Sequence, residues 1–190
     1  YFDENGWLYF TREVFDLFYP GYGDTYPIFN GGIGMTYEQG GGGRAGLAIE
    51  TAEGDTLTLG DRILHHHTTG LSTVETTSRL AGRVLSEFET FYTDAVERPA
   101  GTYRTFVMKA SSGDQRLAAL ASHLDNLGIS YGTVSSGSRV SGRDYRTGTS
   151  TQGRVEPGDL VVSVHQPKGV LTRVLFEPDP SVPDSLTYDI

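Results

Sequence analysis

The residues best suited to chemistry lie between positions 30 and 50, in the stretch NGGIGMTYEQGGGGRAGLAIE. The apolar run at 33–37 stops at one carboxylate, Glu38, and a run of glycines at 40–43 follows it closely. Thr36 and Tyr37 favour an extended strand, whereas glycine allows positive φ and a close approach of the backbone to a ligand. We therefore expect Glu38 at a strand end beside a mobile loop, which suits a general base because the strand fixes the carboxylate and the loop admits substrate. The alternative is a surface glutamate that leads into a turn.

Three consecutive histidines, His65, His66 and His67, raise the question of a metal site. The surrounding pattern predicts a helix, in which consecutive side chains point about 100° apart, so three in a row cannot converge on one ion. We expect one of them to be buried against a sheet and the other two to lie at its rim. The sequence has no cysteine, which excludes a cysteine nucleophile and a thiolate zinc site.

The second half of the chain offers less chemistry. His123 and His165 are isolated, and the serines at 135–138 do not form the G-x-S-x-G pattern of a nucleophile elbow. The Gly- and Ser-rich segments lack a lysine at phosphate-loop spacing. We expect His123 to lie at the surface and His165 to have a structural role where a helix begins.

Several phrases resemble the zinc carboxypeptidases of the M14 type, which are found in many secreted bacterial proteins. The first half resembles the C-terminal part of their catalytic domain through FYPGYGDTYP at 18–27, GMTYEQGG at 34–41 and ILHHHTTGLSTVE at 63–75. The second half resembles the C-terminal domain appended in one large bacterial branch, through GDLVVSVHQPKGVLTRVLFEP at 158–178 and SLTYDI at 185–190. Together the phrases are far more specific than a single glutamate.

This resemblance implies three roles, for which five residues are candidates. Glu38 falls on the glutamate of the last catalytic strand, which in that family activates the zinc-bound water. Tyr19 or Tyr22, and less favourably Tyr26, would be the loop tyrosine that closes over the C-terminal carboxylate of the substrate. An equally good explanation is that these tyrosines only cover the loop and have a structural role. Asp24 is a candidate for the pocket that takes the last side chain of the substrate, although capping or turn formation is favoured.

The family's zinc ligands, a His-x-x-Glu pair and a later histidine, have no counterpart in this sequence and are expected upstream of Tyr1. The resemblance thus implies a C-terminal fragment of a secreted or periplasmic zinc-dependent metallocarboxypeptidase, which hydrolyses C-terminal residues from peptides or proteins. Its partner would be the N-terminal part of the same catalytic domain, and alone it would neither bind catalytic Zn²⁺ nor turn over. The rival hypothesis is a non-catalytic module on a degenerate carboxypeptidase fold that binds a peptide, a glycan or an envelope component.

Composition limits the remaining function classes. The 190 residues carry a formal charge of −9 and fit one large or two small globular domains. This acidic balance argues against a nucleic-acid or anionic-membrane surface, since phosphate contacts need clustered basic residues. The only local basic cluster, Arg139, Arg143, Arg146 and Arg154, is diluted by Gly and Ser. No run reaches the roughly 20 apolar residues that a membrane helix needs.

The elements predicted for residues 1–95 would form the C-terminal part of an α/β/α mixed sheet if the resemblance holds. Apolar spacing predicts a short amphipathic helix at 7–18 and a long helix at about 59–92. Thr58 or Asp61 can cap the long helix, and Gly70 and Gly82 are its weak points. A short strand at 47–49 and a turn at 53–55 precede it.

A polar, Pro- and Gly-containing linker at 96–101 leads to a second unit at 102–190. There we predict a strand at 102–109, a helix at 114–127 stopped by Gly128, and a strand at 129–134. This β-α-β order implies a parallel pair joined by a right-handed crossover. A long loop or exposed hairpin at 135–153, a central strand at 159–164 and a helix at 166–175 complete a small three-layer α/β domain of flavodoxin or amidotransferase-like type. The predicted fold class of the whole chain is α/β.

Overall fold

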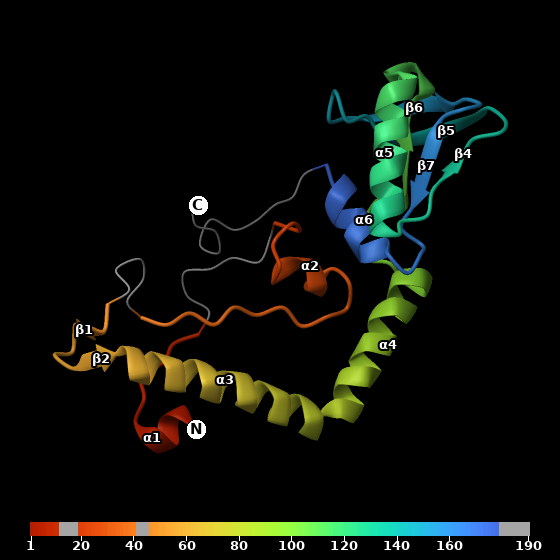
Figure 1. The fold of residues 1–190 in the computed structure, drawn as a ribbon. Coiled ribbons are helices and arrows are strands. Elements are labelled where there is room, and N and C mark those ends of the chain that lie inside the picture. Colours follow the sequence, from red (N-terminus) through yellow and green to blue (C-terminus); the bar gives the residue numbers. More distant parts are fainter. Residues whose placement is uncertain (12–18, 41–45, 179–190) are drawn as a thin grey trace.

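The computed structural model describes residues 1–11, 19–40 and 46–178 (Figure 1). The chain belongs to the α/β class, with helices beside small antiparallel sheets. The elements of the first half are α1 (Phe2–Asn5), α2 (Thr25–Ile28), β1 (Ala48–Glu50), β2 (Thr56–Thr58), α3 (Leu59–Arg79) and α4 (Ala81–Glu97). None of the helices within these described ranges is long and apolar enough to cross a membrane.

The long helix predicted at 59–92 is two helices. Its start is confirmed, because the Thr58 side chain accepts from the Asp61 N–H and the Asp61 carboxylate accepts from the Thr58 N–H, which is a capping box. The break falls at Leu80, whose φ of −102° and ψ of 16° are not helical. Gly82, a predicted weak point, lies just beyond the break, and glycine loses more backbone entropy in a helix than other residues do. Figure 1 shows the sharp change of direction between α3 and α4.

The strand predicted at 33–37 is wrong. Residues 32–39 carry no regular secondary structure and pass from α2 along α3 (Figure 1). Gly34 lies so close to α2 that an added Cβ would sit 1.6 Å from the carbonyl oxygen of Asp24. The Tyr37 hydroxyl lies 2.8 Å from the Thr73 hydroxyl on α3. The segment at 32–39 is therefore held in place by contacts with α2 and α3 and not by pairing with a neighbouring strand. The helix predicted at 7–18 lies mostly outside the described residues, and residues 7–11 are not helical.

The second half contains most of the strands. Its elements are β3 (Thr105–Met108), the 3-10 helix η2 (Ala110–Ser112), α5 (Asp114–Leu127), β4 (Gly132–Thr133), β5 (Ser138–Arg143), β6 (Ser150–Val155), β7 (Leu160–Ser163) and α6 (Gly169–Phe176). The predicted helix at 114–127 is confirmed, and Gly128 ends it in the left-handed region with φ of 68°. The predicted central strand is β7, and the predicted hairpin is formed by β5 and β6.

The prediction that two parallel strands pair directly is wrong. The strand order is β3-β7-β4, and β7 pairs antiparallel with both of its neighbours. β3 and β4 therefore run in the same direction, as the β-α-β order requires, but β7 lies between them and takes the hydrogen bonds of both. Local sequence could not reveal this insertion, because β7 follows β4 only after the whole β5–β6 hairpin.

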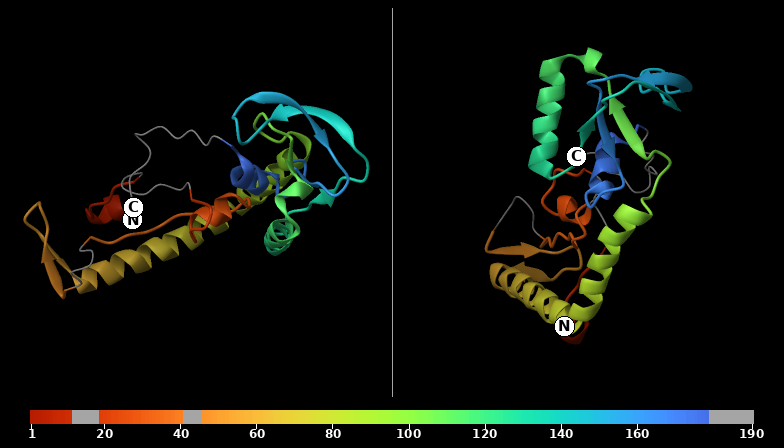
Figure 2. Two further views of the ribbon diagram at one scale, coloured as in Figure 1. Left: turned by 90° about the horizontal axis from the view of Figure 1, so that it is seen from above. Right: turned by 90° about the vertical axis from the view of Figure 1, so that its right-hand side faces the viewer.

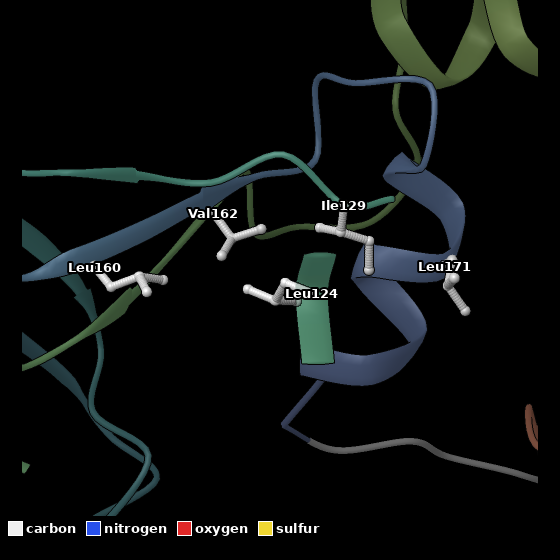
Figure 3. Packing of buried hydrophobic residues seen from close by; sticks show 5 residues of the cluster. All are labelled: Leu124, Ile129, Leu160, Val162 and Leu171. Atoms are coloured by element: carbon white, nitrogen blue, oxygen red, sulfur yellow. The ribbon is translucent and has the colours of Figure 1, made fainter. Parts of the chain in front are cut away.

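The core of the second half lies on one face of this sheet (Figure 3). It is a cluster of buried apolar side chains from β7, α5, α6 and the segment after α5: Leu124, Ile129, Leu160, Val162 and Leu171. The opposite face is not covered to the same degree, because Val107 on β3 is 38% exposed and is paired with the half-buried Val161. The described residues thus form two layers, and the third layer of the predicted flavodoxin-like domain is absent from them.

Residues just after α2 join the two halves. Phe29 packs against the core of the second half. Asn30 accepts hydrogen bonds from Lys168 Nζ at 2.6 Å through its side chain and from the Tyr92 hydroxyl at 3.0 Å through its backbone carbonyl. The end of α4 also meets α6, because an added Cβ on Gly169 would sit 3.1 Å from the Ala95 carbonyl oxygen. Figures 1 and 2 show α2 beside α6, with α1, β1 and β2 farther away along α3.

Candidate functional site

Glu38 lies in the irregular segment between α2 and β1. Its side chain is exposed, and its carboxylate makes no hydrogen bond or ion pair with any described residue. The start of the glycine run is close to the first hairpin, since an added Cβ on Gly40 would sit 3.3 Å from Leu57 on β2. The rest of the expected mobile loop, at 41–43, lies outside the described residues. Glu38 is thus a solvent-facing carboxylate on a segment that α2 and α3 hold in place.

Asp24 is the residue that holds this segment to the loop before α2. Its carboxylate accepts hydrogen bonds from the hydroxyl of Thr36 and, at 3.3 Å, from that of Thr25. The Thr36 hydrogen bond is the largest cause that holds the pKa of Asp24 below its usual range. Asp24 occupies the N-cap position of α2, but its side chain does not cap that helix. Asp24 therefore contacts Thr36, which lies two positions before Glu38 in the chain.

Tyr19 and Tyr22 pack against each other. Their ring centroids are 5.0 Å apart in an edge-to-face arrangement. Tyr19 is 60% exposed and Tyr22 is 39% exposed, and the backbone N–H of Tyr22 donates to the Tyr19 carbonyl at 3.3 Å. The two tyrosines thus form one exposed aromatic pair just before Asp24, on the same loop that Thr36 contacts.

Thr36 and Tyr37, which the sequence pattern marked only as strand-favouring residues, anchor the segment before Glu38. Thr36 contacts Asp24, and the Tyr37 hydroxyl contacts Thr73 on α3 as well as the Met35 sulfur at 2.6 Å. The available signal was the row of hydroxyl residues on one side of α3, since the Thr73 hydroxyl in turn donates to the Thr69 carbonyl four residues earlier. Both neighbours of Glu38 on its N-terminal side are therefore anchored through side-chain hydroxyl groups.

The histidine tract belongs to no group of potential metal ligands within the described part of the chain. His65 is half-buried against α1 and the residues after it, with its ring 4.4 Å from that of Trp7 and 5.5 Å from that of Phe2, measured between centroids. His66 and His67 are exposed. The expectation of one covered histidine and two at the rim holds, but the cover is aromatic side chains and not a sheet.

The zinc ion that the resemblance implies would need a group of ligand side chains close together. Among residues 1–11, 19–40 and 46–178, no group of three or more His, Cys, Asp or Glu side chains is placed to bind a metal. Asp24 and Glu38 are the acidic residues of the candidate site, and Asp24 is already occupied by two hydroxyl donors. The described residues of this chain therefore do not fit a zinc centre.

Comparison of the chain with protein-family models, curated proteins and solved structures gives no match.

Proposed function

We propose that this chain is the C-terminal part of a secreted or periplasmic zinc-dependent carboxypeptidase that removes C-terminal residues from peptides or proteins. The proposal rests first on the phrases GMTYEQGG and FYPGYGDTYP, whose residues Glu38, Tyr19, Tyr22 and Asp24 belong to one stretch of loop around α2. The metal ligands would come from polypeptide outside this sequence, and the chain by itself would be inactive.

The structural observation that carries the proposal is the exposure of the apolar side of α3. Five apolar residues of α3 are between 42% and 68% exposed: Leu59, Ile63, Leu64, Leu71 and Val74. They fall on one side of the helix, because their spacing follows its 3.6-residue period. On its polar side, α3 contacts other described segments through His65 to Trp7 and Thr73 to Tyr37. A helix with this arrangement is stabilised by a further layer of polypeptide on its apolar side.

Glu38 would be the proton acceptor in the proposed enzyme. A general base needs a carboxylate oxygen that is not already occupied and a backbone that holds it in position. The Glu38 carboxylate has no partner among the described residues, and the contacts of Thr36 and Tyr37 fix the backbone before it. Tyr19 and Tyr22 lie on a loop that Asp24 links to this segment, so that a closing movement of the tyrosines would be coupled to the position of Glu38.

The test is made in the polypeptide that the gene encodes, with the residues preceding Tyr1 included. We expect Glu38→Gln to lower the rate of release of C-terminal amino acids by at least about 100-fold, because general-base catalysis contributes about 10²–10⁴-fold. Zinc content, measured by mass spectrometry, should not change. Glu53→Gln, at an exposed turn residue, is the matched control and should retain activity. Full activity of Glu38→Gln would show that Glu38 is not the base.

The second candidate function is a non-catalytic binding module, which is favoured by the exposure of the Glu38 side chain to solvent. The residues encoded upstream of Tyr1 separate the two proposals. A His-x-x-Glu pair followed by a later histidine supports the enzyme. Their absence leaves only the binding function for a peptide, a glycan or an envelope component.

A further inference from the structure

Two arginines face each other across the β5–β6 hairpin. The strands are antiparallel, and their register pairs Arg139 directly with Arg154 and Ser141 with Gln152. Directly opposed residues lie on the same face of a two-stranded sheet, and residues two apart on one strand share that face. Arg139, Arg154 and Gln152 therefore project from one face, where they line an open pocket of about 330 Å³ together with Gly153.

No described carboxylate neutralises this arginine pair. Like charges directly opposed across strands destabilise a hairpin, and none of the described carboxylates lies within ion-pair distance of either guanidinium group. Lys109 gives the contrast, because it lies near the same strand and is paired with both Glu156 and Asp159. The exposed pair is unusual in a chain of net charge −9, in which acidic partners are abundant.

We propose that this pocket binds a tetrahedral oxyanion group, a phosphate or sulfate ester. Each guanidinium presents a planar fork of N–H donors that matches two oxygens of an anion, and the Gln152 amide adds a further donor. One fork satisfies a carboxylate, which has two oxygens in one plane. Two opposed forks fit an anion whose oxygens point to the corners of a tetrahedron, and its charge would neutralise the arginine pair.

The hairpin lies away from the stretch that holds Glu38. Figures 1 and 2 show β5 and β6 at the end of the molecule remote from α1 and α3. The oxyanion pocket is thus distinct from the stretch that holds Glu38, and its occupation does not depend on the proposed peptidase activity.

The test is an NMR titration of the ¹⁵N-labelled chain with sodium phosphate, sodium sulfate and sodium acetate, each at constant ionic strength. We expect saturable shifts of amides in β5 and β6 with phosphate, with sulfate or with both, and binding of acetate at least about tenfold weaker. The ratio of phosphate to sulfate affinity identifies which ester the pocket prefers. Shifts that do not saturate, or equal affinity for acetate, would overturn the proposal.

Variants locate the site on the hairpin. Arg139→Gln and Arg154→Gln should each weaken phosphate or sulfate binding by about tenfold or more, because each removes charge-assisted hydrogen bonds. Arg146→Gln removes the same charge from the hairpin turn, outside the pocket, and should leave the affinity within about twofold. Equal weakening by Arg146→Gln would show general attraction by charge and would contradict a defined pocket.

Thermal unfolding gives an independent readout that also checks the folding of the variants. The anion should raise the Tm of the native chain, because a ligand that binds only the folded state stabilises it. At the same anion concentration it should raise the Tm of Arg139→Gln by less, and the Tm of this variant without anion should be equal to or above that of the native chain because the repulsion has been removed. Gln152→Ala keeps both charges and should weaken binding a fewfold, so it tests the pocket if an arginine variant does not fold.

Discussion

Asp159 is the buried charge on which the second half depends. It is 1% exposed and accepts hydrogen bonds from Lys109 Nζ, from the Ala110 N–H at 2.9 Å and from the Glu156 N–H at 2.8 Å. Burial alone would raise its pKa, but these hydrogen bonds outweigh burial and hold the pKa below the usual range. Through its ionised carboxylate, Asp159 therefore joins the residues that directly follow β3 to the turn before β7.

This arrangement predicts a pH-dependent stability. A depressed pKa in the folded state stabilises the fold above the ordinary pKa of about 3.9, and the contribution is lost as the pH falls through the lower folded value. Asp159→Asn should lower the free energy of unfolding by about 1–3 kcal/mol at pH 7. In urea unfolding, the difference between native chain and variant should shrink below about pH 4. Asp55→Asn, at an exposed turn, should show only a small difference, and a constant gap for Asp159→Asn at all pH values would contradict the assignment.

Sequence could identify candidate residues at this scale but not their partners. Glu38 stands out because it is the one carboxylate between an apolar run and a run of glycines. The contacts of its neighbours, Thr36 with Asp24 and Tyr37 with Thr73, join positions far apart in the sequence and depend on how α2 and α3 are placed. Asp159 was expected only as the first residue of a strand, because its role depends on the distant Lys109.

At the scale of elements, a glycine allows the loop after α2 to meet α4. Gly31 has a φ of 77°, and an added Cβ would lie 3.1 Å from Phe91 and 3.3 Å from both Phe88 and Tyr92. The rings of Phe88 and Tyr92 are themselves in edge-to-face contact with 4.9 Å between centroids. The backbone at Gly31 thus lies directly against these aromatic rings of α4, which only a residue without a side chain permits.

Gly31→Ala should destabilise the chain through two effects. The left-handed backbone costs about 1–2 kcal/mol for a residue with a Cβ, and crowding against the aromatic rings adds about 1–3 kcal/mol. Gly128→Ala is the matched control, because Gly128 has a φ of 68° but its added Cβ would meet only Lys168, at 3.7 Å. Urea unfolding should show a larger loss for Gly31→Ala. Equal losses would mean that the rings move aside without cost.

Elements specified by local signals were predicted well, and those specified by distant contacts were not. The helix that ends at Gly128 has its own apolar period and its own stop residue, and the Thr58–Asp61 capping box is local as well. By contrast, the residues at 33–37 have strand-like composition but no partner strand, because Gly34 packs against Asp24. The placement of β7 between β3 and β4 is likewise determined by pairing across long sequence separations.

At the scale of the whole molecule, the two halves differ in how well they are covered. The second half buries its cluster of Leu124, Ile129 and Val162 against α5 and α6. The first half leaves the apolar side of α3 exposed, and its hairpin of β1 and β2 has only two strands. Two-stranded hairpins are marginal without further packing. The first half should therefore associate with other polypeptide.

We expect the isolated chain to self-associate with increasing concentration through the apolar side of α3. Replacing Leu71 and Val74 together with glutamine should shift the chain towards the monomer in size-exclusion chromatography with light scattering, since it removes exposed apolar area. The paired control, Thr76→Gln with Thr77→Gln, changes exposed polar positions of the same helix and should leave the association as it was. A native chain that remains a monomer at high concentration would contradict both this prediction and the need for a further layer.

Because Phe29 packs against the second half, cleavage at residues 96–101 would not separate the two halves. A protease that cuts there would leave two pieces still attached to each other, because Phe29 remains packed against the core of the second piece and Asn30 remains hydrogen-bonded to Lys168. The C-terminal unit released without residues 26–31 would expose an apolar surface where the Phe29 ring packs. Recombination that moved this unit to another protein would have to transfer the short segment around Phe29 with it.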